Sequence, residues 1–284
     1  MKRNLTLRLA CLFLVLGPLL SAQPVEIYSI SKDIPTATKY EDFKKLVQTI
    51  KAESEQRYLT FDVNVFDVLL KANRNNEVLW LAKAYHEYWP EGDFACPVKS
   101  GSVELVENPV NLAYRLGRDE VVRGLLEIEP ALVNLRGRVH VYFLLPPLAE
   151  AVKKADTAWV REFLVRGAKV DVVVAPEGLP MNLLSISPTP EIDQILLDHH
   201  VETVGTWDEP FPSRCLDNHV RLRKDPSTTS AVLAQINKDE PLQILGYTFK
   251  VFTIGTQSGR WMHVNYQGTV GWVFQAFVAL PDWE

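Results

Sequence analysis

A pair of short apolar helices joined by a polar turn recurs along this chain, and this repeat constrains the fold more than any other feature. In residues 146–173, Leu148 starts one helix, and Val160 and Leu164 share one face of the next. The same pattern covers residues 108–134. One such pair cannot bury its apolar face alone, so neighbouring pairs must stack. The repeats therefore predict an α-helical solenoid.

The segment 146–173 resembles an ankyrin repeat, and weaker copies follow at 181–202 and precede at 65–88. The matching residues are Pro147, Leu148, Ala151, Val160, Phe163, Leu164, Gly167, Ala168, Val170 and Asp171. Ala155 stands where the family usually has a turn glycine. The resemblance covers about residues 60–202 and implies stacked helix pairs over 58–202; a generic helical domain is the alternative. The expected core contains Leu112, Ala113, Val122, Leu126, Leu148, Ala151, Val160 and Leu164.

The hydrophobic pattern changes period after Cys215. From residue 219 onward, short alternating segments are separated by turn residues, which indicates a small all-β barrel. This region, about 216–281, resembles bacterial SH3-like domains. The matches are Val220, Arg221, Pro226, Ser227, Ser230, Val232, Leu233, Lys238, Leu242, Leu245, Gly246, Trp261, Val264, Gly268, Gly271, Trp272 and Val273. Asp239 replaces the usual glycine, and the loop from Tyr247 to Gly259 is longer than usual.

The first 22 residues are typical of a secretory signal peptide. Lys2 and Arg3 precede an apolar run, Leu9–Leu20, which small residues follow at Ser21. The run is too short to span a membrane as a helix, which takes about 20 residues. We therefore expect cleavage after Ala22, export to the periplasm or beyond, and no membrane span in the mature protein.

The expected organisation is a multidomain α + β chain, an ankyrin-like solenoid followed by an SH3-like barrel. Residues 1–22 are the signal peptide and 23–57 an N-terminal segment with a capping helix. The chain continues with helical repeats at 58–202, a linker at 203–215 that mixes Pro, Gly and charged residues, and the SH3-like domain at 216–284.

Two cysteines remain after signal cleavage, Cys96 and Cys215. Export makes a disulfide between them an open possibility, and two buried free thiols are the alternative.

The sequence offers little support for enzymatic chemistry. No Gly-x-Ser-x-Gly elbow or phosphate-binding glycine loop is present. The histidines are scattered except for His199 and His200, where no carboxylate or cysteine stands at metal-ligand spacing. A net charge of −5 gives no basic field for nucleic acid. We therefore expect no catalytic residues, no metal and no cofactor.

Aromatic side chains concentrate in the C-terminal region and suit binding. We expect Trp261, Tyr247, Phe249, His263 and Trp272 to supply ligand contacts, because rings give large contact areas at low entropic cost. Strand alternation puts Trp261 opposite the core residue Val264, so Trp261 is the expected exposed hot spot. Trp272, deeper in the strand run, is expected to be structural.

These features predict an exported, non-enzymatic binding or scaffold protein. The helical repeats would bind a protein partner, and the SH3-like domain would bind a peptide or peptidoglycan. The alternative is an envelope enzyme, or a regulator of a peptidoglycan hydrolase, because such barrels often accompany cell-wall hydrolases. Fold alone does not name the partner.

Overall fold

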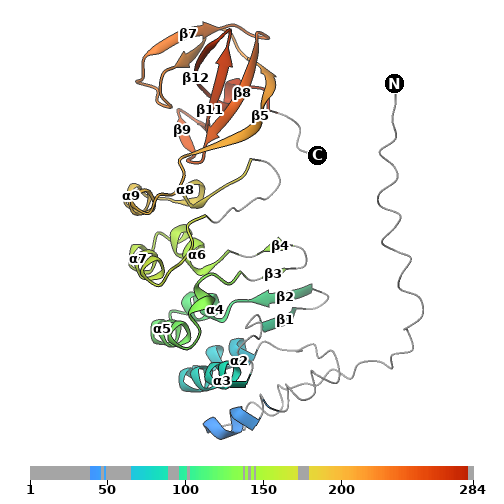
Figure 1. Cartoon of the computed structure of the whole chain (residues 1–284), viewed down its shortest axis with the longest axis vertical. Coiled ribbons are helices and arrows are strands. Elements are labelled where there is room, and N and C mark those ends of the chain that lie inside the picture. The colour runs from blue at the N-terminus through green and yellow to red at the C-terminus, as the bar shows by residue number, and fades with distance from the viewer. Residues whose placement is uncertain are drawn as a thin grey trace, which may run out of the picture.

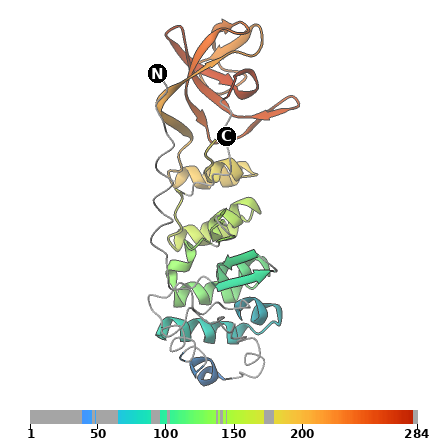
Figure 2. The same ribbon diagram turned by 90° about the vertical axis from the view of Figure 1, so that its right-hand side faces the viewer.

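A computed structural model describes residues 39–45, 48, 65–88, 96–100, 103–136, 138–139, 142–143, 145–171 and 179–280. Helix pairs stack in a row, and a β-rich domain follows at the end of the row (Figures 1 and 2). The expected signal peptide and most of the 23–57 segment lie outside the described residues, although residues 40–45 are helical.

Four consecutive helix pairs form the row. The pairs are α2 (Val65–Lys71) with α3 (Asn75–Tyr88), α4 (Pro109–Arg115) with α5 (Asp119–Ile128), α6 (Pro147–Lys153) with α7 (Thr157–Val165), and α8 (Leu183–Ile186) with α9 (Pro190–Asp198). A 3₁₀ turn, η3 (Pro130–Val133), follows α5. All eight expected core residues are buried, from 0% exposed at Ala113 to 8% at Leu164. The stacking of pairs therefore agrees with the period read from the sequence.

Strands project from one side of the row between the helix pairs (Figure 1). They form a four-stranded antiparallel sheet in the order β1-β2-β3-β4. Their bounds are β1 Cys96–Ser100, β2 Val103–Glu107, β3 Arg138–Val139 and β4 Tyr142–Phe143. Because β2 pairs with β3, hairpins of successive repeats are joined by backbone hydrogen bonds.

The turn inside each of the first three pairs has the same backbone geometry. Asn73, Gly117 and Ala155 have φ values of 59°, 66° and 58°, in the left-handed region. At Ala155, the backbone N–H donates to the carbonyl of Val152, and the next N–H donates to Ala151. This paired arrangement ends a helix by satisfying its last carbonyls. The position that the sequence marks as a usual glycine is therefore left-handed although it holds alanine.

Asparagine side chains tie neighbouring segments of the row together. The buried Asn108 caps α4, and its amide donates to the carbonyls of Leu132 and Leu135. Asn182 caps α8 and donates to the carbonyl of Glu202 in the same way. Each side chain thus satisfies a helix start and fixes the segment that leaves the repeat.

The C-terminal region forms a six-stranded antiparallel sheet in the order β5-β8-β11-β12-β6-β7. The strands are β5 Val204–Arg214, β6 Val220–Arg223, β7 Val232–Ile236, β8 Pro241–Thr248, β11 Trp261–Tyr266 and β12 Thr269–Phe274. A separate hairpin, β9 (Phe252–Ile254) with β10 (Gln257–Gly259), occupies the long loop, and a 3₁₀ turn, η4 (Gln275–Phe277), follows β12. The turn residue Asp239, which replaces a usual glycine, has a φ of 66°.

The expected linker at 203–215 is wrong. Most of this segment is strand β5, which pairs with β8 at the edge of the sheet. Its prolines, Pro210 and Pro212, suggest a loop, but an edge strand tolerates residues that cannot donate a backbone hydrogen bond. Only residues 199–203 therefore separate α9 from the sheet.

Of the two cysteines in the possible disulfide, the structure describes the side chain of Cys215 alone. Cys215 is a buried free thiol, and its Sγ donates to the carbonyl of Asp217 at 3.3 Å. It lies in the β domain, whereas Cys96 begins β1 among the helix pairs; the side chain of Cys96 lies outside the described residues. Burial raises the pKa of the Cys215 thiol, so it packs as a small apolar group.

Candidate binding sites

Two of the five aromatic residues expected to bind ligand form an exposed pair. The rings of His263 on β11 and Trp272 on β12 stack with centroids 4.6 Å apart and an interplanar angle of 26°. They are direct partners in the strand register, and both side chains are partly exposed. Directly opposed residues of antiparallel strands share one face of the sheet. The pair therefore presents two flat rings on the outer face.

The pair belongs to a row of residues that crosses the sheet. In register, Thr206 on β5 opposes Gly246 on β8, Gly246 opposes His263, and Trp272 opposes Arg223 on β6. A Cβ at Gly246 would lie 2.5 Å from the carbonyl oxygen of Gly205, so the approach of β5 requires glycine there. The row thus has no side chain beside His263 on the β8 side.

The charge at this pair is low. Burial lowers the pKa of His263, so its imidazole is neutral at neutral pH. The Arg223 guanidinium donates from Nη1 to the carbonyl of Ser230 at 2.8 Å, and the residue is only 9% exposed. The pair therefore offers flat, weakly polar surface, which suits stacking more than ion pairing.

The sequence predicts that Trp261 faces solvent, but the structure shows it buried. Its side chain is 3% exposed, and its ring packs edge-on against Phe274 with centroids 5.7 Å apart. Met262 is buried too, so both faces of the strand are covered where β11 begins. The register between β11 and β8 also shifts between His263 and Val264. Alternation still places Trp261 opposite Val264, but its face of the sheet is covered at this end of the strand. Trp261 is therefore buried and Trp272 is partly exposed, the reverse of the prediction.

Tyr247 and Phe249 are also buried, at 3% and 7% exposure. Their rings pack edge-on with centroids 5.4 Å apart, and the ring centroids of Trp207 and Tyr247 are 4.9 Å apart. The Arg260 guanidinium lies 5.2 Å from the centroid of the Tyr247 ring. These rings belong to the junction between the sheet and the last helix pair, so they do not form a groove with Trp272.

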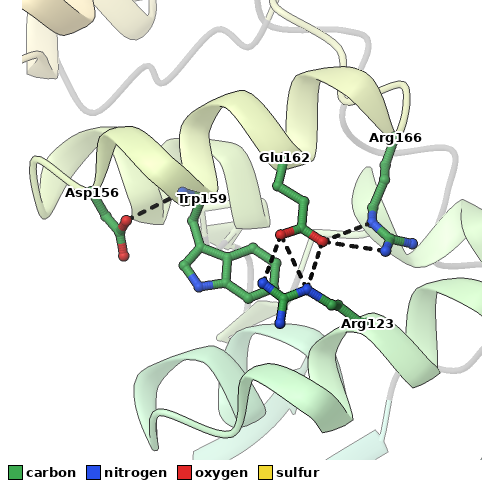
Figure 3. Close-up of polar contacts among 5 residues, drawn as sticks. All are labelled: Arg123, Asp156, Trp159, Glu162 and Arg166. Carbon is green, nitrogen blue, oxygen red and sulfur yellow. Dashed lines mark hydrogen bonds and ion pairs between the residues drawn. The ribbon is translucent and has the colours of Figure 1, made fainter.

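A cavity of about 350 Å³ lies between the second and third helix pairs, where the turns within the pairs are adjacent. Its lining is aromatic and charged: Tyr114, Gly117, Asp119, Arg123, Lys154, Asp156, Ala158, Trp159 and Glu162. Figure 3 shows Arg123 of α5 reaching Glu162 of α7 beside the Trp159 ring. The sequence analysis missed this cluster, because its members come from different repeats.

Three charged residues that line the cavity, Arg123, Asp156 and Glu162, have partners within the chain. Arg123 donates to both carboxylate oxygens of Glu162, and Glu162 also accepts from Arg166. The Arg123 guanidinium lies 5.0 Å from the centroid of the Trp159 ring. The hydrogen bond from Arg123 lowers the pKa of Glu162. Burial and the Asp156 carboxylate, which accepts from the Tyr114 hydroxyl, raise the pKa of Tyr114. The cluster therefore joins successive repeats.

Among the described residues, no group of three His, Cys, Asp or Glu side chains could hold a metal ion. Within the same residues, no helix is both long and apolar enough for a membrane crossing.

Comparison with known proteins identifies one part of the chain. Residues 218–279 match the family described as bacterial SH3 domain. This segment begins just before β6 and ends after η4, and it contains both His263 and Trp272. Neither a curated protein nor a solved structure matches the chain. The β-rich region is thus similar to bacterial SH3 domains, and β5 adds a strand outside the matched segment.

Proposed function

We propose that this protein is an exported, non-enzymatic binding protein whose SH3 domain contacts a peptide or the cell wall. The observation that carries the proposal is the stacked His263–Trp272 pair on the outer face of a domain that matches bacterial SH3 domains. Bacterial SH3 domains are binding domains that are often associated with the cell wall. Partly exposed tryptophans are enriched among the residues that dominate binding energy.

The helical part supports a second binding role. Its residues resemble ankyrin repeats, and stacked repeats present an extended surface to protein partners. We propose that this surface binds a protein in the cell envelope. Export rests on the basic and apolar pattern of residues 1–22. Sequencing the N-terminus of the protein isolated from its native envelope tests export, and an intact Met1 would contradict it.

Co-sedimentation of the purified mature protein with peptidoglycan tests the SH3 role. We expect the protein to sediment with peptidoglycan without releasing soluble muropeptides. Trp272→Ala should weaken binding by about 30-fold, because truncating a hot-spot ring costs about 2 kcal/mol or more. Val270→Ala is the matched control, since Val270 lies on the same strand and is 46% exposed. Equal binding by the two variants would show that the His263–Trp272 pair does not contact peptidoglycan.

The alternative function is an envelope enzyme or a regulator of a peptidoglycan hydrolase. It rests on the frequent association of such domains with cell-wall enzymes. Release of muropeptides by the purified protein would support an enzyme. Faster release by an added hydrolase, with none by the protein alone, would support a regulator.

A further inference from the structure

The last helix pair and the SH3 domain share one continuous core. Helix α9 ends at Asp198 and β5 begins at Val204. Leu196 and Val201, at the end of the helical row, belong to the same cluster of buried residues as Tyr247 and Phe249 of the β domain. The backbone N–H of Phe249 also donates to the carbonyl of Thr203. The two folds therefore meet through packed side chains and backbone contacts.

Two cations of the β domain reach into the last helix pair. Lys250 donates to the carbonyl of Ser187 at 2.8 Å and pairs with the Asp193 carboxylate of α9 at 2.9 Å. Arg260 donates to the carbonyl of Pro180 at 2.9 Å. Lys250 therefore bonds α9 and the turn between α8 and α9, and Arg260 bonds the segment before α8.

The burial of Arg260 ties its guanidinium to one set of partners at the junction. Arg260 is 5% exposed, and its guanidinium lies over the Tyr247 ring. A buried charge is costly unless its hydrogen bonds are satisfied, so Arg260 favours the position that brings it to Pro180. From the helical side, the Ser185 hydroxyl donates to the carbonyl of Phe249 at 2.8 Å. Donors thus cross the junction in both directions.

The junction repeats a feature of the contacts within the row. His86 of α3 pairs with Glu129 after α5, and Arg123 of α5 pairs with Glu162 of α7. At the end of the row, Asp193 of α9 finds its cation in the SH3 domain, at Lys250. The β domain thus supplies the contact that a further helix pair would make. A terminal repeat needs such a cover, because its outer apolar face has no neighbour.

We infer that the SH3 domain is the C-terminal cap of the helical row, and that residues 247–250 with Arg260 form its docking surface for the α8–α9 pair. This role goes beyond the proposed binding function. The aromatic loop that sequence analysis assigned to an external ligand has an occupant within the chain. Removing the docking contacts should loosen α8 and α9 first and leave β6 and β7, far from the junction, unchanged.

Amide hydrogen exchange of the full chain tests the cap. Lys250→Met removes the charge and keeps the apolar stem, and we expect α8–α9 amides to exchange about tenfold faster. Lys238→Met is the control, since Lys238 is exposed in a turn of the same domain, and its amide pattern should match the unsubstituted protein. Unchanged exchange of α8–α9 in Lys250→Met would overturn the inference.

A reciprocal variant covers the case in which Lys250→Met disturbs the β domain itself. Asp193→Asn acts from the helical side, and it should speed exchange of the 247–250 amides. Combining it with Lys250→Met should add little, because both remove one ion pair. Full additivity of the two effects, or no effect of Asp193→Asn on the 247–250 amides, would refute the cap.

Discussion

Two equivalent turns of the helical row allow a pair of substitutions that should change the stability of the protein in opposite directions. Ala155 has a φ of 58° and Gly117 a φ of 66° at matching positions. An L-residue in the left-handed region costs roughly 1–2 kcal/mol, which glycine avoids. Glycine loses about 0.4–1 kcal/mol through the greater freedom of the unfolded chain. Ala155→Gly should therefore stabilise the protein by about 0.5–1 kcal/mol, and Gly117→Ala should destabilise it by a similar amount.

The structure excludes a steric explanation for the second variant. A Cβ at Gly117 would have nothing within 4 Å, so only backbone conformation changes. Asn73, with a φ of 59°, is the intermediate case, since asparagine tolerates this region better than alanine. Asn73→Gly should therefore stabilise less than Ala155→Gly.

Urea unfolding followed by far-ultraviolet circular dichroism measures all three variants. With a slope of about 2 kcal/mol/M, the expected changes move the midpoint by about 0.25–0.5 M. Ala155→Gly should raise the midpoint and Gly117→Ala should lower it. If both substitutions move the midpoint in the same direction, the backbone argument is refuted.

Four further measurements test the packing and the charges. Trp261→Ala removes a ring that is 3% exposed and should cost about 3–5 kcal/mol, and Trp272→Ala should cost less; calorimetry that ranks them the other way would reverse the two faces. Leu164→Ala should cost about 2–5 kcal/mol in urea unfolding, and a loss below about 0.5 kcal/mol would place Leu164 outside the core. Glu162→Gln breaks a partly exposed ion-pair cluster and should cost about 0.5–1 kcal/mol at low salt; a cost that salt leaves unchanged would argue against ion pairing. Burial lowers the pKa of His263, so the unfolded chain binds the proton first and stability falls as pH drops below about 6.5. His263→Gln should reduce that loss in a pH series of unfolding curves, and an unchanged slope would contradict it.

Local patterns predicted much of this structure because they follow from local physics. Helical spacing located α6 and α7, and the two family departures, Ala155 and Asp239, mark left-handed turns. In both turns the backbone geometry persists although the glycine is gone. The positions where the family patterns have glycine therefore identified the left-handed turns, although the alanine and aspartate found there do not themselves indicate one.

Features that depend on distant segments were missed. Pro210 and Pro212 suggested a linker, and only pairing with β8 shows that they lie in an edge strand. Alternation gave Trp261 the correct side of β11 but the wrong exposure, because both faces of the strand are covered at its start. The fully buried Asn108 resembles a surface residue in sequence, because the carbonyls it binds lie more than 20 residues away. Each error arose where tertiary contacts override a local period.

The packed junction between the last helix pair and the β domain sets how the protein would use the two targets proposed above. Modules joined by a flexible spacer gain avidity over a broad range of target separations. Here the His263–Trp272 pair and the helical surface keep one distance and one orientation. Joint binding therefore requires targets whose separation matches this geometry, and the protein would discriminate between assemblies of identical components by their spacing.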